Sequence, residues 1–421
     1  MDIFKKKESK VRSYSNNFPV VFQKAQGSWL EAENDNKYLD FLAGAGSLNY
    51  GHNNPILKDA LLTYITNDGI THGLDMHSEA KAEFLHALEK YIFAPRDLDY
   101  KVQFTGPTGT NAVEAALKLA RKFTGRQNVV AFTNGFHGCT MGALAATGNQ
   151  HHRGGAGMPL TGVTRIPYEN YANVDGLSLF ETLLSDSSSG LDMPAAVLLE
   201  AVQGEGGLNV ASNEWLQKLS SICQKHQILL IVDDIQAGCG RTGTFFSFEP
   251  SGIKPDLVTL SKSISGFGLP MAVVLLKPKL DVWNPGEHNG TFRGNNHAFI
   301  TATKALELYW ADSHFEQHIS ERSSQIRAHL EQSLHKFPHL FKRIKGRGMM
   351  IGIECRKPDV ASLITRNCFE RGMIIETAGP NDEVVKFFCP LTITKAELAQ
   401  GLEIFEASSE VAAQQIVKKA S

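Results

Sequence analysis

Cysteine pairs with the spacing of a metal site or a redox motif are absent from this sequence. The chain has six cysteines, and none of them form a Cys-x-x-Cys pair. They are Cys139, Cys223, Cys239, Cys355, Cys368 and Cys389. Widely separated cysteines are typical of reduced thiols in the cytosol rather than of a disulfide framework. We therefore expect a cytoplasmic protein without a bound metal ion.

Long apolar runs and a strong net charge are absent as well. No apolar run approaches the roughly 20 residues of a membrane span, and the opening MDIFKKKESK lacks the apolar core of a signal peptide. A formal net charge of −2 gives no electrostatic attraction to nucleic acid or to an anionic membrane. We expect a soluble protein that acts on small molecules.

Two apolar runs end abruptly at polar residues, and the rest of the chain is organised around them. Ile228–Val232 stops at the carboxylates Asp233 and Asp234, and Leu257–Leu260 is followed closely by Lys262. Short apolar runs of this kind are typical of strands that are buried on both faces of a parallel sheet. Ligands bind beyond the carboxyl ends of such strands, so the acid and the lysine are expected to face one crevice.

Pyridoxal phosphate chemistry needs such a pair of residues. A lysine holds the cofactor aldehyde as a Schiff base, and a carboxylate keeps the ring nitrogen protonated. Taken alone, however, Asp233 fits a helix cap and Lys262 a solvated lysine at least as well. The choice between these interpretations depends on the rest of the chain.

The chain repeats a strand, a glycine-rich turn and a helix. After the predicted strand Val102–Phe104, Gly109 and Thr110 stand where a helix begins, a position suited to binding phosphate. A glycine turn with a threonine cap explains these two residues equally well. Phe136 falls in the turn after the next strand, where its ring either stacks on a flat ligand or packs against the protein.

At least six predicted strands alternate with helices, which indicates a doubly wound α/β domain. We place this large domain at residues 56–311. Residues 312–421 mix strands with helices and predict a smaller α+β domain. The N-terminal segment, residues 1–55, contains a small meander that we expect to complete the smaller domain.

One long motif carries a resemblance to a known family. It consists of an apolar run, Asp-Asp-Ile-Gln, Gly-Arg-Thr-Gly, Pro-Asp and a lysine, all within residues 228–262. From about Val20 to the last strand the chain resembles the class III, ornithine/GABA-type, pyridoxal-phosphate aminotransferases. The resemblance implies fold type I, an α/β fold with a mostly parallel sheet in the large domain.

The resemblance also implies roles for individual residues around the cofactor ring. Lys262 would form the Schiff base, Asp233 would pair with the ring nitrogen, and Gln236 would contact the ring hydroxyl. Phe136, in the motif Phe-His-Gly, would stack on the ring. Glu205, in the motif QGEGG, would line the substrate side.

At the phosphate end, the resemblance implies that Gly109 and Thr110 bind through backbone and hydroxyl groups. Thr291, in the motif NGTF, corresponds to a threonine that reaches the phosphate from the neighbouring subunit. We therefore expect a homo-oligomer, a dimer at least, whose active site is shared between subunits.

The chain departs from the family at two substrate-binding positions. Cys139 stands where ornithine- and GABA-type members have an arginine after His-Gly, and Lys386 stands where they have an arginine in a late strand. Burying a substrate carboxylate without a cationic partner is costly, so another arginine is expected to serve. Arg293, close to Thr291, is the first candidate and Arg12 the second; an ordinary surface or interface arginine is the alternative for each.

Four segments, among them THGLDMHSEAK and GALAATGNQHHRGGAG, resemble one subgroup of the family. That likeness implies transfer of an amino group from L-glutamate to L-aspartate 4-semialdehyde, giving L-2,4-diaminobutyrate and 2-oxoglutarate, as in ectoine biosynthesis. An ornithine/GABA-type ω-aminotransferase and a glutamate-semialdehyde-type aminomutase remain alternatives. A cofactor-dependent DNA-binding regulator fits less well, because no basic helix-turn-helix stretch precedes Phe18.

Overall fold

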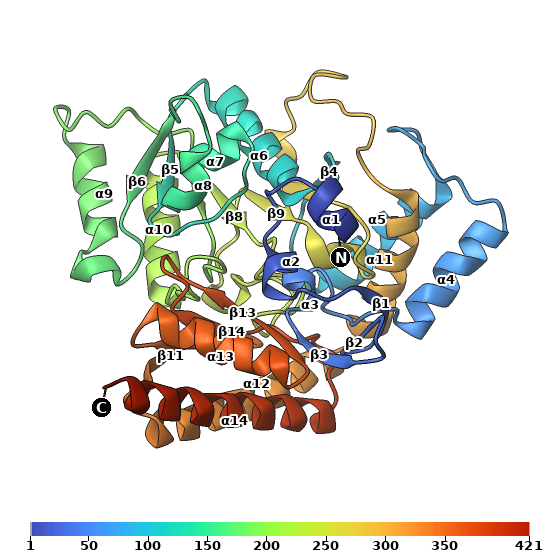
Figure 1. Cartoon of the computed structure of the whole chain (residues 1–421). Coiled ribbons are helices and arrows are strands. Elements are labelled where there is room, and N and C mark those ends of the chain that lie inside the picture. Colours follow the sequence, from blue (N-terminus) through green and yellow to red (C-terminus); the bar gives the residue numbers. More distant parts are fainter. Residues whose placement is uncertain (1, 421) are drawn as a thin grey trace.

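A mostly parallel sheet forms the centre of the larger part of the fold in a computed structural model that describes residues 2–420 (Figure 1). Its seven strands lie in the order β4-β10-β9-β8-β7-β5-β6, and only β10 runs antiparallel to its neighbours. They are β4 (Lys101–Phe104), β5 (Val129–Phe132), β6 (Val163–Ile166), β7 (Ala196–Leu199), β8 (Leu229–Asp233), β9 (Leu257–Leu260) and β10 (Val273–Leu276).

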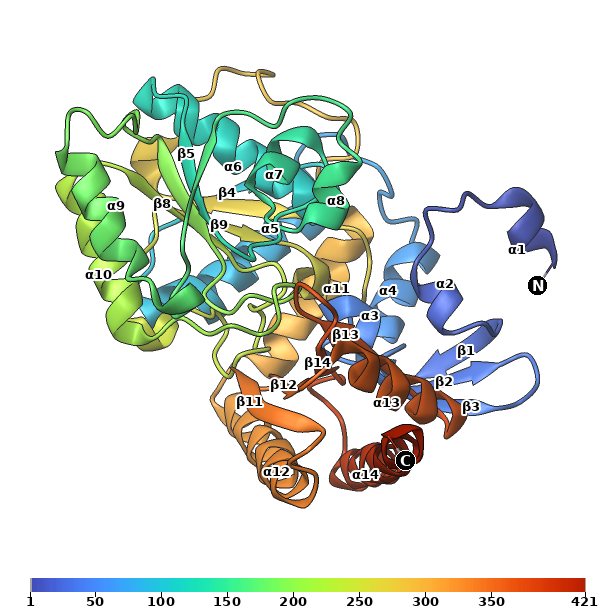
Figure 2. The same cartoon turned by 60° about the vertical axis from the view of Figure 1, so that its left-hand side comes forward.

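The central strands are apolar because helices cover both faces of this sheet. Every residue of β5, β7, β8, β9 and β10 is buried. Alternate side chains enter two different cores: Val129 and Ala131 pack with α6, whereas Val130 and Phe132 pack with α9 and α10. The helix α9 lies at the left-hand edge of the molecule in Figure 1, and α9 and α10 together form the left-hand edge in Figure 2.

The helices of this part follow or precede the strands in sequence. They are α4 (Pro55–Thr66), α5 (Glu79–Ala87), α6 (Gly109–Thr124), α7 (Met141–Ala146), α8 (Gln150–Gly154), α9 (Gly176–Ser185), α10 (Asn213–Lys225) and α11 (Asn296–Tyr309). The helix α6 ends at Gly125, whose φ of 69° is accessible to glycine at little cost.

A second seven-stranded sheet combines strands from the two ends of the chain, in the order β1-β2-β3-β13-β14-β12-β11. Its strands are β1 (Phe22–Gln26), β2 (Trp29–Ala32), β3 (Lys37–Phe41), β11 (Phe341–Arg347), β12 (Met350–Cys355), β13 (Met373–Ala378) and β14 (Val384–Phe387). Only β3 and β13 pair in parallel. The helices α12 (His314–Lys336), α13 (Pro358–Glu370) and α14 (Lys395–Ala420) lie at the bottom of Figure 1, and α1 (Asp2–Lys7), α2 (Tyr14–Asn17) and α3 (Ala43–Gly46) precede or follow the meander.

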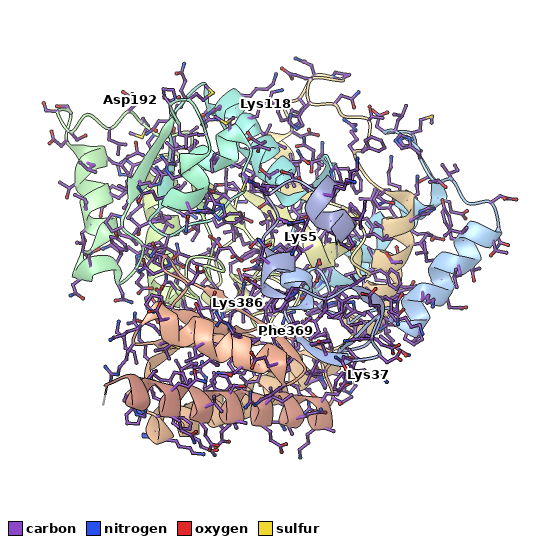
Figure 3. All side chains as sticks on the ribbon, in the orientation of Figure 1. Lys5, Lys37, Lys118, Asp192, Phe369 and Lys386 are labelled. Atoms are coloured by element: carbon purple, nitrogen blue, oxygen red, sulfur yellow. The ribbon has the colours of Figure 1, made fainter. Side chains whose placement is uncertain are left out.

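The side chains of β14 point alternately toward the helices and toward the larger sheet. Val385 and Phe387 belong to the core under the helices, whereas Val384 packs with Val202 from the larger part. Lys386 shares the orientation of Val384, because side chains of a strand alternate. Figure 3 shows Lys386 where the smaller sheet meets the rest of the chain.

The predicted α/β fold with a mostly parallel sheet and a smaller mixed part is confirmed. The domain limits at residues 55 and 311 stay a prediction. Within residues 2–420, none of the helices combines the length and the apolar character needed to cross a membrane.

Candidate active site

Asp233 and Lys262 lie at the same edge of the larger sheet, each directly beyond a strand. Asp233 is the last residue of β8, and Lys262 begins a short 3-10 helix after β9, the strand next to β8. Asp233 is buried, and its Oδ1 accepts hydrogen bonds from Thr259 Oγ1 at 3.1 Å and from the Ile235 N–H at 3.3 Å. These two donors hold the Asp233 carboxylate in a fixed position at the strand end.

His137 contacts the buried Asp233 carboxylate and was not singled out from the sequence. Its Nδ1 lies 2.7 Å from Asp233 Oδ2, and its backbone N–H donates to Thr147 Oγ1 at 3.0 Å. Burial opposes a charge on the ring, yet the hydrogen bond to Asp233 and its negative charge raise the pKa of His137. A protonated His137 donates to Asp233 and fixes the carboxylate in place.

The amine of Lys262 is half-buried and held by the N-terminal segment. Lys262 has a φ of 52°, an uncommon value for a residue with a Cβ. Its Nζ donates to the Ala45 carbonyl at 2.7 Å. Burial lowers the pKa of Lys262, partly offset by Glu205. A lowered pKa makes the neutral, nucleophilic amine more accessible.

Gln236 connects Lys262 to Lys386, which is fully buried. Its Nε2 donates to the Ala45 carbonyl at 3.1 Å and to Glu205 Oε1 at 3.1 Å. Its Oε1 lies 3.4 Å from Lys386 Nζ, which also lies 3.3 Å from Glu205 Oε1. Lys386 and Lys262 together lower the pKa of Glu205 to about 2, against the effect of burial. The structure therefore brings three of the predicted site residues together beside Lys262: Gln236, Glu205 and Lys386.

The N-terminus of α6 lies next to the loop that follows Asp233. A Cβ at Gly109 would lie 2.9 Å from Ile235 Cδ1, so this turn leaves no room for a side chain. Thr110 Oγ1 lies 2.6 Å from Thr140 Oγ1. The first N–H groups of a helix lack intrahelical acceptors and attract anions, which suits a phosphate.

Phe136 is half-buried in the turn before α7, and its N–H donates to Glu200 Oε1 at 2.8 Å. Burial raises the pKa of Glu200 to about 7. The Phe136 ring makes an edge contact with the His152 ring at a centroid distance of 5.2 Å. Cys139, three residues further on, is exposed.

Three of the predicted site residues make their contacts elsewhere in this chain. Thr291 is exposed in the loop between β10 and α11. In the same loop Arg293 pairs with Asp75, with Nη2 to Oδ2 at 3.1 Å. The Nη1 of Arg12 donates to the Phe4 carbonyl at 2.9 Å and to Glu8 at 3.3 Å.

Glu376 and Tyr14 belong to the same cluster and were missed from the sequence. Glu376 pairs with Lys386 across β13 and β14, and its Oε1 lies 2.9 Å from Lys386 Nζ. Tyr14 comes from α2, and burial together with Glu376 and Glu205 raises the pKa of its hydroxyl. Because paired residues of neighbouring strands share a face, the pairing of β13 with β14 would have placed Glu376 beside Lys386.

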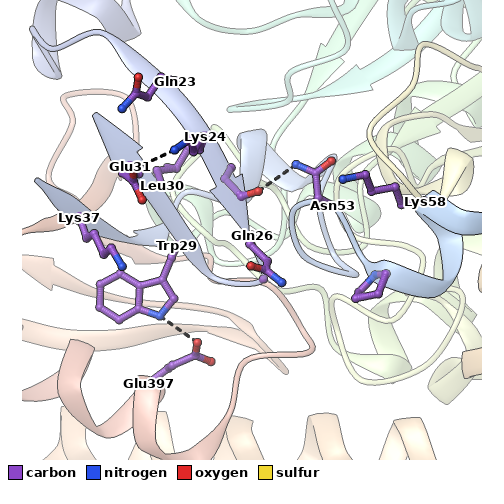
Figure 4. A pocket seen from close by; sticks show the side chains of 13 residues that line it. Gln23, Lys24, Gln26, Trp29, Leu30, Glu31, Lys37, Asn53, Lys58 and Glu397 are labelled. Carbon is purple, nitrogen blue, oxygen red and sulfur yellow. Dashed lines mark hydrogen bonds and ion pairs between the residues drawn. The ribbon is translucent and has the colours of Figure 1, made fainter. Parts of the chain in front are cut away.

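An open hollow of about 870 Å³ lies away from these residues, over β1 and β2 (Figure 4). Trp29 Nε1 donates to Glu397 there at 2.9 Å, and Lys24 lies 3.6 Å from Glu31. These are exposed or half-buried side chains without the buried, coupled charges found at the strand ends. The strand ends are therefore the better candidate for an active site.

The fold and these paired strand-end residues define an aminotransferase of the class that uses a lysine beside a buried acid. Residues 11–408 match the family model described as aminotransferase class III, and the chain belongs to that family. The predicted family resemblance is confirmed.

Relatives with one shared name match the chain over its whole length. It is 73% identical over 421 residues to a diaminobutyrate–2-oxoglutarate transaminase of Vibrio parahaemolyticus, with 100% of both chains covered. It is 55% identical to one of Halalkalibacterium halodurans, covering 97% of this chain and 96% of the relative. The ornithine aminotransferase of Toxoplasma gondii has a similar structure, with a TM-score of 0.85, 26% identity, and 98% and 94% of the two chains covered.

Proposed function

We propose that this protein is a pyridoxal-phosphate-dependent transaminase that converts L-glutamate and L-aspartate 4-semialdehyde to 2-oxoglutarate and L-2,4-diaminobutyrate. The observation that carries the proposal is the 73% identity, over the full length of both chains, to a diaminobutyrate–2-oxoglutarate transaminase. The buried Asp233 and the half-buried Lys262 at neighbouring strand ends supply the chemistry that such a reaction requires.

The residues at the strand ends fit pyridoxal phosphate. The buried Asp233 is suited to the ring nitrogen, Gln236 to the ring hydroxyl and Phe136 to one face of the ring. Lys262 would hold the aldehyde carbon. When bound, this cofactor supplies a protonated ring that accepts the electron pair left on the substrate carbon.

Each side chain then has a defined task. Asp233, fixed by His137 and Thr259, would keep the ring nitrogen protonated through its negative charge. Lys262 Nζ would be the base that moves a proton between the substrate Cα and the aldehyde carbon of the cofactor. Its lowered pKa favours the neutral amine that this proton transfer requires.

The phosphate end of the site would be shared between two copies of the chain. Gly109 and Thr110 would bind the phosphate through the N-terminal N–H groups of α6. Thr291 lies in an exposed loop, from which it would reach the phosphate of a second copy. The neighbouring side chain, Phe292, is 67% exposed, which also suits an interface.

Substrate carboxylates need cations, and Lys386 is the cation that this chain places beside Lys262. Glu205 and Gln236 hold it there. Arg293 remains the predicted further anchor, supplied with Thr291 by the second copy, and Arg12 the second candidate. Both arginines carry carboxylate or carbonyl partners in this chain, which a substrate would have to replace. A cytoplasmic location also remains a prediction.

The proposed acceptor is tested by product analysis with a panel of aldehydes. The enzyme is incubated with glutamate and, separately, with the semialdehydes of aspartate, glutamate and succinate. The proposal predicts fastest formation of L-2,4-diaminobutyrate from the aspartate semialdehyde. Preferential formation of ornithine or 4-aminobutyrate would support the ornithine/GABA-type alternative, and conversion of a semialdehyde without glutamate would support an aminomutase.

A further inference from the structure

A cluster of one lysine and two glutamates lies beside Lys262. Lys386 carries the one positive charge and is fully buried, with 0% of its surface exposed. The carboxylates of Glu205 and Glu376 lie 3.3 and 2.9 Å from Lys386 Nζ. One lysine therefore serves two carboxylates, and a buried carboxylate with an incomplete set of donors is costly.

Glu376 is the carboxylate with the weaker set of partners. Its Oε1 accepts no hydrogen bond with good geometry from the residues that the structure describes, although the charged Nζ of Lys386 lies 2.9 Å away. Glu205, in contrast, accepts from both Gln236 and Lys386. Glu376 lies on β13, opposite Lys386 on β14, so strand pairing fixes its position. A further hydrogen-bond donor, such as a substrate ammonium, would satisfy this oxygen.

The cluster lies where the far end of a short substrate would be. The Lys262 amine and Gln236 share the Ala45 carbonyl, and Gln236 continues to Glu205 and Lys386. The electrostatic influence of Glu376 reaches Lys262 as well. A molecule that reacts next to Lys262 would therefore extend its far end toward this cluster.

The two proposed substrates differ in what they present there. L-glutamate carries its amino group at the reacting carbon, so only a carboxylate is left at the far end. The four-carbon semialdehyde reacts at its aldehyde and keeps both an ammonium and a carboxylate on its α-carbon. Lys386 suits the carboxylate in both cases, while a buried carboxylate oxygen that still lacks a hydrogen-bond donor suits only the ammonium.

On this basis, and resting on the proposed function, we infer that Glu376 binds the α-ammonium of the semialdehyde acceptor and of the diamine formed from it. Glu205 shares this task. Glu376 is then a specificity residue. It distinguishes L-2,4-diaminobutyrate from 4-aminobutyrate, which has the same carbon chain, terminal amine and carboxylate but lacks the α-ammonium.

The test compares these two amines as donors to 2-oxoglutarate, in the reverse direction, for wild-type enzyme and Glu376→Gln. The wild type is expected to have a higher kcat/KM for diaminobutyrate than for 4-aminobutyrate. The variant is expected to lower the value for diaminobutyrate at least ~10-fold, as loss of a buried charge partner does. Its KM for glutamate in the forward direction is expected to fall or stay unchanged, since the site loses a negative charge. Damage to the fold would instead weaken the binding of both glutamate and diaminobutyrate.

Glu354→Gln is the matched control, because Glu354 is a buried glutamate of the same sheet that pairs with Lys342 and Arg343 outside the site. It is expected to retain the wild-type preference. Glu376→Asp keeps the charge and is expected to recover part of the preference. Calorimetric titration of borohydride-reduced holoenzyme, in which no turnover occurs, measures the binding of both amines directly.

Two outcomes would overturn the inference while leaving the transaminase proposal intact. One is a Glu376→Gln enzyme that keeps the wild-type ratio of the two kcat/KM values. The other is equal binding of the two amines to reduced wild-type holoenzyme, which needs no variant. A wild-type enzyme that converts neither amine would contradict the proposed function itself.

Discussion

At the scale of single residues, the charge of Asp233 is the feature on which the proposed chemistry depends most. The carboxylate is 4% exposed and is held by His137, Thr259 and the Ile235 N–H. None of these groups needs to move when a ligand arrives, so the charge is in place before the reaction. Preorganised charges of this kind contribute much of the rate enhancement of enzymes.

Replacing Asp233 with asparagine keeps the size and removes the charge. We expect kcat to fall by at least ~100-fold, because each 1.4 kcal/mol of barrier is a factor of ten in rate. Steady-state kinetics with glutamate measures this loss, and the visible absorbance reports whether the cofactor is retained. Asp256→Asn, at the opposite end of the neighbouring strand, is the control. A kcat within threefold of wild type would mean that Asp233 only caps the loop.

Asp234 makes a different, pH-dependent contribution to stability. It is buried, and its Oδ2 accepts from the Ser247 N–H at 3.0 Å, while Oδ1 has no hydrogen-bond partner within residues 2–420. Burial raises the pKa of Asp234 from its usual 3.8 to about 7. The folded state therefore binds this proton more tightly than the unfolded chain, and stability is lost as pH rises from about 4 to about 7.

Asp234→Asn removes this titration. Relative to the variant, the wild type is expected to lose up to about 4 kcal/mol of unfolding free energy between pH 4 and pH 8, the equivalent of roughly three pKa units. Urea unfolding of the cofactor-free proteins at several pH values measures the difference. Parallel pH profiles of the two proteins would show that Asp234 stays ionised in the fold.

At the scale of elements, Arg241 joins the two sheets behind the candidate site. It is fully buried, and its guanidinium donates to Asn49 Oδ1 at 2.5 Å and to the Cys389 carbonyl at 2.6 Å. It also stacks over the Phe388 ring at 4.1 Å. The arginine of the Gly-Arg-Thr-Gly motif thus holds residues from the N-terminal, central and C-terminal parts of the chain.

Arg241→Lys keeps a positive charge but cannot make the planar set of hydrogen bonds. We expect it to destabilise the protein by about 2–4 kcal/mol, since several buried acceptors lose their donors. Thermal unfolding followed by circular dichroism measures this effect. Arg343→Lys, at an exposed position on β11, should change stability by less than about 0.5 kcal/mol. Equal effects of the two substitutions would contradict a role for Arg241 in joining the sheets.

The apolar runs of the sequence predict the inner strands of the larger sheet well, because β5, β7, β8, β9 and β10 are buried along their whole length. Asp233 and Lys262 were predictable for the same reason, since a polar residue directly after such a run lies at the sheet edge. His137 and Glu376 were not predictable in this way. A lone histidine in a turn has no distinctive spacing, and the partner of Glu376 depends on the pairing of β13 with β14.

At the scale of the whole molecule, the proposal requires a second copy of the chain to complete each site. Lys262, Asp233 and the N-terminus of α6 are together, whereas Thr291 and Arg293 lie in a loop with exposed residues. If a second copy supplies Thr291, an inactive chain can still complete the site of its partner. A mixture of two differently inactivated chains tests this arrangement.

Lys262→Ala is expected to be inactive, and Thr291→Glu to be nearly so because its carboxylate would repel the phosphate. Co-expressed with separate tags, the two variants should recover about a quarter of the wild-type rate. Random pairing makes half of the dimers mixed, and each mixed dimer has one intact site. No recovery above the two parent rates would place Thr291 in the site of its own chain. Size-exclusion chromatography with light scattering confirms that the mixed species is an oligomer.

The most direct test of the proposed reaction follows the nitrogen atom. L-[15N]glutamate and unlabelled L-aspartate 4-semialdehyde are incubated with the holoenzyme, and the diamine is examined by 15N NMR. The proposal predicts that the label appears at the 4-amino group of L-2,4-diaminobutyrate, with one 2-oxoglutarate released for each diamine formed. An unlabelled diamine, or label confined to glutamate while the semialdehyde is unchanged, would contradict it.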